Sequence, residues 1–533
     1  MSASSTQYDY VIVGAGSAGA TVATRLSEDP GTSVLLLEAG PEDRSYWSKI
    51  PLGFAKIIFD PRYMWNHQSE PEPNLNHRRV GLPHGKVVGG SSAINGLVFV
   101  RGDPYDYQTW ERLGARGWGY DDVVPYFRKN ESWIGGSDAL HGDDGPIAVE
   151  HARWRNPLAD AFIASAQQAL GIPRNDDFNG ATREGAGYWP LNTRRGRRSS
   201  TSEEMIKPNR NRRNLDILTE AMASKIVFEG REATGVVFER GGQTHHVSAR
   251  REIILSAGAL QSPQLLQLSG VGPADLLARQ GIAVVHALEG VGENLMDHLQ
   301  VGRFYSTSSP DTFNVRVRNA FAQVLAGMNY YLGPRNGVLT IGAALGGAFF
   351  KTRPDVAAPD VQLHFIPFTP GDKGWDLGKG SGIRLAAYQS RPESRGHVRI
   401  TSPDARTLPA VQFNHLSTAT DVRTVLDMMK LASRIAAAEP FRQFDLKETR
   451  PGPVGDDELL DYVRGNADTS FHFSGTARMG EDDLAVVDPQ LRVRGVNRLR
   501  VVDASIMPTV VSGNTNAATL MIAEKGADLI KAG

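Results

Sequence analysis

The sequence predicts a mixed α/β and α+β fold that opens with a Rossmann-like strand–helix–strand unit. Residues 8–13 form a short apolar run, a glycine-rich turn follows at once, and a helix-like segment comes next. A second apolar run, SVLLLEAG, carries Glu38 near its end. Because 533 residues exceed what one compact core usually holds, we expect two or three domains.

The first turn has the residues that a dinucleotide-binding turn needs. Gly14, Gly16 and Gly19 form the pattern G-x-G-x-x-G. This pattern permits a tight turn, close approach of the backbone to a pyrophosphate, and close packing of helix on strand. Glu38 stands where a carboxylate can accept hydrogen bonds from ribose hydroxyls. The pattern predicts dinucleotide binding but does not separate FAD from NAD.

Composition excludes several classes of function. A formal net charge of −1 gives no long-range attraction to nucleic acid, so we expect no nucleic-acid partner. The absence of cysteine excludes disulfides, thiolate nucleophiles and cysteine-bound metals. No group of His, Asp and Glu has metal-site spacing, so no metal is expected. The start MSASSTQ lacks the features of a signal peptide, and no apolar run has transmembrane length. These features favour a cytoplasmic enzyme without a transmembrane segment.

Two further stretches combine small residues with apolar ones. Residues 84–110, HGKVVGGSSAINGLVFVRGDPYDYQTW, read as a glycine–serine turn followed by an apolar strand. Small residues in such a turn suggest backbone pressed against a buried flat ligand, although a surface loop is the alternative. Residues 258–272 read as a turn followed by a helix that starts near Pro263.

These stretches resemble the glucose–methanol–choline (GMC) family of FAD-dependent oxidoreductases. Four later segments agree with the resemblance, in the family's order and over nearly the whole chain. They are VGENLMDH (291–298), FHFSGTARMG (471–480), LRVRGVNRLRVVDASIMP (491–508) and GNTNAATLMIAEKGADLI (513–530).

The resemblance implies two discontinuous domains. The chain would build a Rossmann-like FAD-binding domain and a substrate-binding domain with an antiparallel sheet and helices. The expected FAD-binding domain comprises 1–157, 214–303 and 462–533, and the substrate-binding domain comprises 158–213 and 304–461.

Within the expected substrate-binding domain, three stretches predict regular structure. Residues 396–404 and 409–416 read as strands of its sheet. Residues 418–438 have apolar residues at helical spacing, and Met428 and Met429 are expected to pack in the core rather than bind a ligand.

The resemblance also implies the catalytic pair. In the family, the histidine of the segment H-x-x-G-T-x-[RK]-M-G lies at the reactive face of the flavin, and a histidine or asparagine follows about 40 residues later. These positions are His472 and Asn514 here. Hydride leaves an alcohol carbon only as the hydroxyl loses its proton, and a neutral imidazole is a suitable base. Asparagine can hold the alcohol oxygen without competing for the proton.

Cofactor contacts carry over from the family residue by residue. The phosphate turn is matched by Gly14, Gly16, Ser17, Ala18 and Gly19, the ribose acid by Glu38, and the turn at the isoalloxazine edge by Val88, Gly90, Ser92 and Asn95. The adenine position is Ala223, and the pyrophosphate–ribityl region is matched by Asp503 and Ala504. The donors near the flavin pyrimidine are Thr515 and Asn516, and the tryptophan beside the cofactor is Trp65.

Two departures from the family pattern matter. Some relatives attach FAD covalently through a histidine in the glycine–serine turn, whereas Ile94 stands there, so we predict noncovalent FAD. The catalytic segment commonly continues His-Pro-Val-Gly, whereas Phe473 replaces the proline here. We expect Phe473 to belong to the core, and Phe471 either to do the same or to line an aromatic or apolar substrate pocket.

The sequence therefore predicts oxidation of a primary alcohol to the aldehyde by hydride transfer to flavin N5. Oxygen or a quinone-type carrier would accept the electrons, and no sequence feature separates the two. The alternative from another class is a cyanohydrin lyase with a non-redox flavin. A light-driven decarboxylase is disfavoured because the chain lacks cysteine. A nicotinamide enzyme or a non-catalytic dinucleotide module would carry no yellow cofactor.

Overall fold

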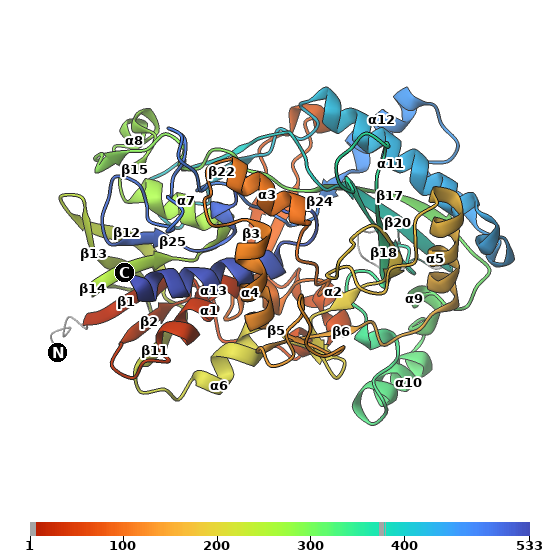
Figure 1. Ribbon diagram of the computed structural model, residues 1–533, viewed down its shortest axis with the longest axis horizontal. Helices are drawn as coiled ribbons and strands as arrows, with labels where there is room; N and C mark the ends of the chain where they lie inside the picture. The colour runs from red at the N-terminus through yellow and green to blue at the C-terminus, as the bar shows by residue number, and fades with distance from the viewer. Residues whose placement is uncertain (1–6, 372–377, 379) are drawn as a thin grey trace.

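The computed structural model describes residues 7–371, 378 and 380–533 and contains two large sheets side by side (Figure 1). The first sheet lies on the left in Figure 1 together with both chain ends, and the second lies on the right. Each sheet has seven strands. The mixed α/β and α+β class predicted from the sequence is confirmed.

The first sheet is mainly parallel and is built from distant parts of the chain. In spatial order its strands are β11 (Leu215–Leu218), β2 (Val34–Leu37), β1 (Gln7–Val13), β14 (Gln243–Leu255), β13 (Glu232–Arg240) and β12 (Met222–Glu229), with β25 (Leu499–Val501) also paired to β14. β11, β2, β1, the end of β14 and β25 run parallel, whereas β13 pairs antiparallel with β14 on one side and with β12 on the other. The predicted strands at 8–13 and at the SVLLLEAG run are confirmed as β1 and β2.

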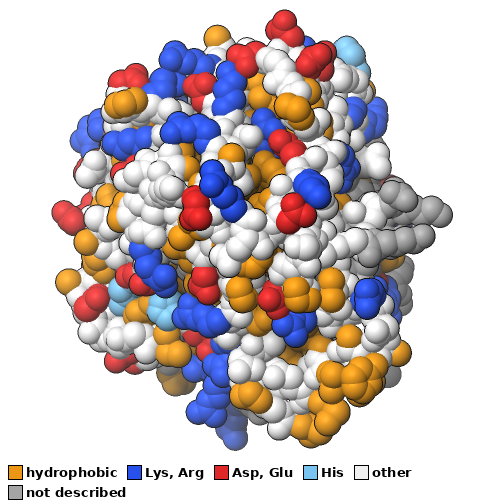
Figure 2. Space-filling model, turned by 90° about the vertical axis from the view of Figure 1, so that its right-hand side faces the viewer, with side chains coloured by type: hydrophobic (Ala, Val, Ile, Leu, Met, Phe, Trp, Pro, Cys, Tyr) orange, Lys and Arg blue, Asp and Glu red, His pale blue; other side chains and the backbone are white. Residues whose placement is uncertain are grey.

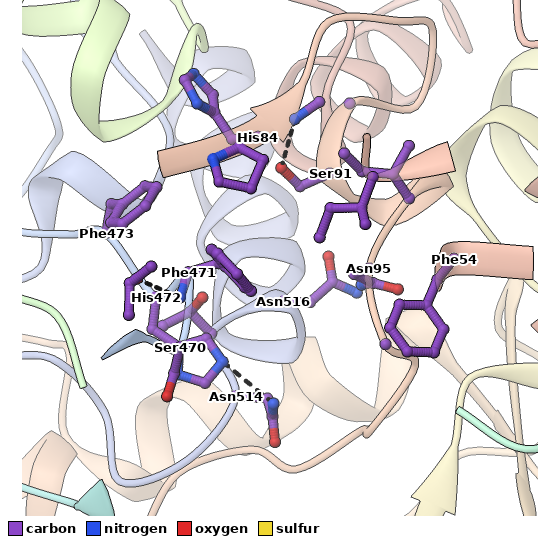
Figure 3. Close-up of a pocket in the computed structure, with 18 of the residues that line it drawn as sticks. Phe54, His84, Ser91, Asn95, Ser470, Phe471, His472, Phe473, Asn514 and Asn516 are labelled. Atoms are coloured by element: carbon purple, nitrogen blue, oxygen red, sulfur yellow. Dashed lines mark hydrogen bonds between the residues drawn. The ribbon is translucent and has the colours of Figure 1, made fainter. Parts of the chain in front are cut away.

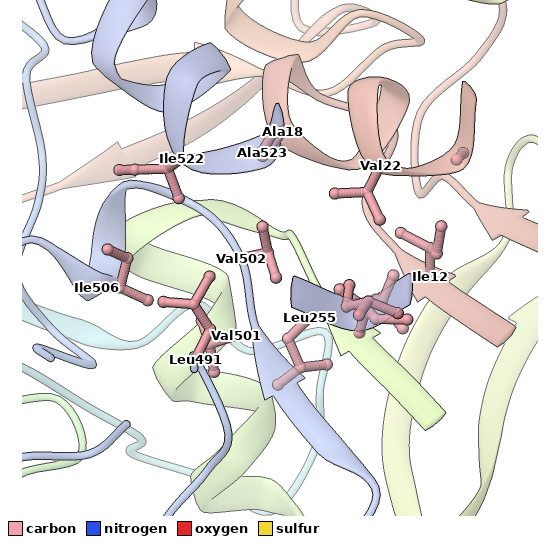
Figure 4. Close-up of a cluster of buried hydrophobic side chains, with 14 of the residues drawn as sticks. Ile12, Ala18, Val22, Leu255, Leu491, Val501, Val502, Ile506, Ile522 and Ala523 are labelled. Carbon is pink, nitrogen blue, oxygen red and sulfur yellow. The ribbon is translucent and has the colours of Figure 1, made fainter. Parts of the chain in front are cut away.

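Two helices from opposite ends of the chain cover this sheet. α1 (Ser17–Leu26) follows β1, and α13 (Asn516–Ala532) packs beside it (Figure 1). Val22 of α1 and Ile522 of α13 point toward apolar residues of β1 and β25, including Ile12 and Val501 (Figure 4). Burying these branched side chains stabilises the fold and fixes the start of both helices against the sheet.

The second sheet is antiparallel and is covered by helices. In spatial order its strands are β23 (Lys447–Arg450), β17 (Leu299–Ser306), β20 (Gly382–Gln389), β19 (Val361–Ile366), β18 (Gly346–Phe350) and β7 (Gly185–Tyr188), with β24 (Asp468–Thr469) also paired to β17. α5 (Pro157–Leu170) and α11 (Ala419–Ala437) pack on it, with α12 (Asp456–Asn466) beside α11. α11 confirms the helix predicted over 418–438, and Met428 and Met429 are fully buried.

The remaining elements connect the two sheets. The helices among them are α2 (Phe54–Ile57), α3 (Pro104–Arg112), α4 (Tyr120–Asn130), α6 (Lys207–Asn209), α7 (Gly258–Leu268), α8 (Ala274–Arg279), α9 (Phe313–Arg316) and α10 (Ala320–Tyr331). The small sheets pair β3 (Met64–Gln68) with β4 (Gly81–Gly85), β5 (Glu131–Trp133) with β6 (Ile147–His151) and β8 (Pro190–Leu191), β9 (Thr193–Arg194) with β10 (Arg197–Arg198), and β15 (Val271–Gly272) with β16 (His286–Ala287).

Two of the sequence-based predictions differ from the structure. The stretches 396–404 and 409–416 do form strands, β21 (His397–Arg399) and β22 (Ala410–Gln412), but they pair only with each other among the described strands. The apolar stretch after the glycine–serine turn is no named strand, and Val98 makes a single bridge to Leu191. Short apolar runs do not reveal their partners, and a strand forms only where a partner strand is available.

α7 begins earlier than the sequence suggested. It starts at Gly258, so Pro263 lies inside the helix rather than in its first turn. Proline cannot donate to the carbonyl four residues before it, which is that of Ala259. The Thr476 hydroxyl donates to this carbonyl at 2.6 Å instead. Thr476, from the FHFSGTARMG segment, thus supplies the hydrogen bond that Pro263 cannot make within the helix.

The surface carries a group of apolar side chains on α10 and on Leu332, the residue that follows it. Phe321, Val324, Leu325, Met328 and Leu332 are each at least half exposed. Hydrophobic side chains gather at the bottom of the face drawn in Figure 2, at the height where α10 lies in Figure 1. Within the described part of the chain, no helix combines the length and apolar character needed to cross a bilayer.

Candidate active site

A cavity of about 680 Å³ extends from the first sheet to the face of the second. At one end it is lined by Val13 and Leu37, the last residues of β1 and β2. At the other end it is lined by side chains of β17 and β20, among them Gln300 and Tyr388. Ligands of parallel α/β sheets bind at the carboxyl ends of the strands, which is where this cavity begins.

Two helices begin at the cavity without a side-chain cap. α1 starts at Ser17 and α13 at Asn516, and no side chain accepts from the first N–H groups of either. The Ser17 hydroxyl donates to the Asn516 side-chain oxygen at 2.7 Å, so the two starts are joined. Uncapped N–H groups at the positive end of a helix suit a phosphate group or a negatively charged ring edge.

Glu38 ties the glycine turn to the second strand. Its carboxylate is buried and accepts hydrogen bonds from the N–H groups of Ala15 and Gly40, each at 2.8 Å. Burial raises its pKa to about 7, although these two bonds and the charge of Lys86 oppose the shift. The residue predicted to hold a ribose therefore also holds the turn.

The two glycine-rich turns press against each other. A Cβ atom on Gly90 would lie 2.6 Å from the Gly16 Cα atom, and the Gly89 N–H donates to Ala15 at 2.8 Å. A Cβ atom on Gly16, by contrast, would meet nothing nearer than 3.8 Å. The Gly16 side of the turn thus leaves open space that faces the cavity.

Most of the predicted cofactor residues line this cavity. They are Gly14, Gly16, Ser17, Ala18, Glu38, Trp65, Gly90, Asn95, Ala223, Asp503, Ala504, Thr515 and Asn516. Three do not. Gly19 is a packing position, because a Cβ atom there would lie 1.9 Å from the Gly14 carbonyl oxygen. Val88 is buried in the core of the first sheet, and the Ser92 hydroxyl donates to the carbonyl of Gly89 at 2.7 Å.

The residues present fit FAD. The uncapped helix starts suit its pyrophosphate, the Gly16 gap leaves room for it, and Glu38 can accept from its ribose. The cavity reaches from these groups to the predicted catalytic pair His472 and Asn514.

The segment around His472 is held by a neighbouring stretch of backbone. Met296 and Ser474 exchange backbone hydrogen bonds of 3.0 and 3.1 Å. The His472 N–H donates to the Asp297 carboxylate at 2.8 Å. Phe471 has φ +62, an unusual conformation for a bulky residue. The pairing sets the side chains of His298 and His472 next to each other.

One ring nitrogen of His472 is bound on the protein side. His298 Nδ1 lies 2.8 Å from His472 Nδ1, and His298 Nε2 lies 3.0 Å from the Ser390 carbonyl oxygen. A carbonyl only accepts, so His298 Nε2 carries the hydrogen and a neutral His298 must accept at Nδ1. His472 therefore donates from Nδ1, which leaves its Nε2 unprotonated and able to accept a hydrogen bond or a proton.

The other ring nitrogen meets Asn514. The Asn514 side-chain amide donates to His472 Nε2 at 3.1 Å (Figure 3). Gln362 fixes the orientation of Asn514, because its amide donates to the Asn514 oxygen at 3.2 Å. The Tyr388 hydroxyl in turn donates to the Gln362 oxygen. A single network of hydrogen bonds thus sets the orientation of both predicted catalytic side chains.

Burial keeps both imidazoles neutral. The His472 pKa lies well below its usual value because of burial, and the nearby His298 and His364 act in the same direction. Burial likewise lowers the pKa of His298 to about 4. Burial raises the pKa of Asp297 to about 7, opposed by its bonds from Thr469 and His472. The site holds an unprotonated base near neutral pH.

The flanking phenylalanines differ in their surroundings. Phe473 is buried in the core of the second sheet, as predicted, and lies 5.7 Å from the ring of Phe413, but it also lines the cavity. Phe471 is 37% exposed and lines the cavity. Figure 3 shows its ring on one side of the cavity and Phe54 on the other.

Several residues that support the site were missed in the sequence. His298 lies in the VGENLMDH segment, which was recognised without a role for this histidine. Tyr388 and Gln362 come from β20 and β19, where the sequence shows no motif. His84 lines the cavity and lies 2.7 Å from the Gln261 side-chain oxygen. Among the described residues, no cluster of three or more His, Asp or Glu could hold a metal ion.

A largely parallel sheet with a glycine turn, joined by a cavity to a neutral buried imidazole, is typical of an enzyme that binds a dinucleotide cofactor. The sequence matches the N-terminal GMC oxidoreductase domain over residues 8–300 and the C-terminal one over 392–523. The chain belongs to the GMC oxidoreductase family. It binds FAD and is an FAD-dependent alcohol oxidoreductase that acts on CH–OH donors.

Similar proteins match over nearly their whole length. An oxygen-dependent choline dehydrogenase of Photobacterium profundum is 40% identical over 531 residues, covering 98% of this chain and 93% of the relative. An alcohol dehydrogenase [acceptor] of Pseudomonas putida is 41% identical, covering 98% and 95%. The crystal structure of pyridoxine 4-oxidase from Mesorbium loti is 31% identical, with a TM-score of 0.89 and 98% of both chains covered.

Proposed function

We propose that the protein oxidises a primary alcohol to the aldehyde, with His472 as the base and Asn514 as the group that holds the alcohol oxygen. The observation that carries the proposal is the unprotonated Nε2 of His472, set by the bonds from His472 to His298 and from His298 to Ser390. When bound, FAD supplies the acceptor for the hydride that leaves the alcohol carbon.

The two side chains divide the work on the substrate hydroxyl. His472 Nε2 accepts the hydroxyl proton, and burial keeps the ring unprotonated beforehand. The Asn514 amide, 3.1 Å from this nitrogen, donates to the alcohol oxygen and limits its orientation. Gln362 keeps the Asn514 amide nitrogen turned toward the site.

The lining supports an alcohol with an apolar or aromatic body. Leu52, Phe54, Ile58 and Phe471 line the cavity. Such side chains gain free energy by burying an apolar substrate surface, and aromatic rings can also pack against an aromatic one. We therefore propose an aromatic or other apolar primary alcohol.

The electron acceptor is oxygen or a quinone-type carrier. The two relatives described above differ in this respect, since one is named oxygen-dependent and the other is named for an acceptor. A panel of primary alcohols, read by peroxide formation beside dye reduction, tests both the substrate and the acceptor. Bleaching of the flavin absorbance by an alcohol without oxygen supports oxidation, whereas no bleaching by any alcohol contradicts it.

We further propose that FAD is bound noncovalently. Ile94 lines the cavity where some relatives have a histidine that attaches the flavin, and its side chain has no nucleophile. The division into an FAD-binding domain (1–157, 214–303, 462–533) and a substrate-binding domain (158–213, 304–461) is also proposed. The boundary at 303 crosses β17, which belongs to the second sheet. Location in the cytoplasm stays a prediction from the sequence.

A further inference from the structure

Three strands of the second sheet present three rows of side chains to the cavity. Residues directly opposite each other on neighbouring strands share a face, and so do residues two apart along a strand. In the order β17, β20 and β19, the rows are Gln300, Tyr388 and Gln362; Gly302, Ala386 and His364; and Phe304, Arg384 and Ile366.

The first row lies at the proposed reaction centre. Tyr388 donates to Gln362, which orients Asn514. The Tyr388 ring also stacks on His298 with the ring centres 4.5 Å apart. The hydroxyl end of a substrate therefore belongs at this row.

Two of the three residues in the second row have little or no side chain, which leaves space above the sheet. Gly302 has no side chain and Ala386 has only a methyl group. Burial lowers the pKa of His364 to about 3, so the ring is neutral at ordinary pH. The residues of this row therefore contribute no charge to the cavity.

Arg384 belongs to the third row, and its cationic side chain extends back over the second row. A Cβ atom on Gly302 would lie 2.6 Å from the Arg384 Nε atom, so the Arg384 side chain crosses the gap that this glycine leaves. Its Nη2 atom lies 3.4 Å from the Gln300 side-chain oxygen. The guanidinium thus points along the sheet toward the reaction centre.

The charge of Arg384 is poorly compensated. Within the described chain, it forms no ion pair, and its buried Nε atom has no hydrogen-bond partner. Arg450 adds a second cation to the lining, with its guanidinium 4.2 Å from the Phe304 ring. Asp468 is the nearby carboxyl, and burial raises its pKa. A guanidinium with free donors in a cavity favours an anionic partner.

We propose that the alcohol substrate carries a carboxylate, which Arg384 binds while the hydroxyl lies at His472. The inference rests on the proposed alcohol oxidation and names the class of alcohol. The Arg384 guanidinium extends back from the third row over the second, so the hydroxyl and the carboxylate are about one row spacing apart. Neighbouring rows are about 7 Å apart, so the substrate has a rigid or extended body of roughly that length. A quaternary ammonium alcohol such as choline is disfavoured, because Arg384 and Arg450 repel its charge.

The test compares three alcohols in the purified flavoprotein without oxygen. The probes are para-(hydroxymethyl)benzoate, the uncharged para-methylbenzyl alcohol, and choline. We expect the carboxylate probe to reduce the flavin with the highest kcat/KM and choline with the lowest. A preference for choline or for the uncharged alcohol over the carboxylate would overturn the inference.

Variants separate this inference from the proposed function. Arg384→Gln should lower kcat/KM for the carboxylate probe by about tenfold to a hundredfold, the loss expected for one charge-assisted hydrogen bond. It should lower kcat/KM for para-methylbenzyl alcohol much less than for the carboxylate probe, and Arg384→Lys should restore part of the loss. Arg423→Gln, an exposed arginine on α11, is the matched control.

Each outcome of the variants decides one claim. Equal kcat/KM for the carboxylate in Arg384→Gln and wild type contradicts the role of Arg384, while turnover of the uncharged alcohol still supports alcohol oxidation. If none of the three alcohols reduces the flavin of the wild-type protein or of the variants, the proposed function is contradicted, and so is the inference that rests on it.

Discussion

His298 Nδ1 lies 2.8 Å from His472 Nδ1, and this contact determines which nitrogen of His472 is unprotonated and available as the proposed base. The backbone carbonyl of Ser390 takes the hydrogen of His298 Nε2, so His298 can only accept at its other nitrogen. The hydrogen of His472 therefore stays on the protein side. The Ser390 carbonyl, which does not titrate, thus fixes the tautomer of His472 through two successive hydrogen bonds.

Removal of His298 should slow the reaction without removing the base. In His298→Ala, the His472 hydrogen loses its acceptor and the ring can take the other tautomer, with the hydrogen toward the substrate. We expect the limiting rate of flavin reduction to fall by about tenfold or more, while the alcohol dissociation constant changes little. Stopped-flow reduction over a range of alcohol concentrations separates the two quantities.

A structural role alone would give a different pattern. If His298→Ala loses FAD or unfolds, while its reduction rate per bound flavin stays at the wild-type value, His298 does not set the tautomer. His246→Ala, at an exposed histidine of β14, is the control for loss of an imidazole elsewhere.

The pH dependence of reduction should follow from the lowered pKa of His472. A base whose pKa lies well below 6.5 is already unprotonated at neutral pH. We therefore expect the rate of flavin reduction to be constant from pH 6.5 upward and to fall only in more acidic solution. A rise in rate between pH 7 and 9 would mean that the base is protonated at neutral pH, contrary to this account.

Asn514→Asp should shift the dependence of the flavin reduction rate on pH to higher pH. A carboxylate 3.1 Å from His472 Nε2 would stabilise the protonated ring and raise its pKa. The reduction rate should then increase with pH through the neutral range. Asn514→Ala, which adds no charge, should slow reduction but keep the flat profile. An unchanged profile in Asn514→Asp would place the titrating group elsewhere.

The glycine turn predicts two distinct effects of adding one methyl group. Gly19→Ala would place a Cβ atom 1.9 Å from the Gly14 carbonyl oxygen, so the apoprotein should lose about 1–3 kcal/mol of stability. Gly16→Ala meets no protein atom within 3.8 Å, so the apoprotein should be as stable as wild type. It should nevertheless bind FAD about tenfold or more weakly, because the methyl group occupies the approach to the phosphate.

Thermal unfolding of the apoproteins and FAD titration measure the two effects. Equal FAD affinity in Gly16→Ala and wild type would show that the phosphate does not approach this turn.

Noncovalent attachment predicts release of the cofactor by acid. When the yellow protein is precipitated with acid, the colour should remain in the supernatant, because Ile94 offers no atom for a bond to the flavin. Colour retained in the washed pellet would refute this.

Local patterns in the sequence predicted the parts of the fold that depend on local interactions. The apolar run of β1, the glycine turn and the helical spacing of α11 each follow from residues close together in the chain. The strands at 396–416 were predicted as elements but assigned to the wrong sheet, because pairing depends on partners far away in sequence.

The proposed catalytic pair, His472 and Asn514, came from the resemblance, whereas the residues that orient it were found only in the structure. His298 and His472 are 174 residues apart, and Gln362 and Asn514 are 152 apart. Arg384 joins the cavity only through the register of β17, β20 and β19. No spacing within one segment encodes such contacts, so sequence reasoning could not find them.

The central claim is that His472 accepts the alcohol proton, and the reduction of bound FAD in His472→Ala tests it most directly. Measured without oxygen at saturating alcohol, the variant should retain FAD but be reduced at least about a hundredfold more slowly than wild type, the lower range for loss of a general base. Reduction at nearly the wild-type rate would contradict the account and remove His472 from that role.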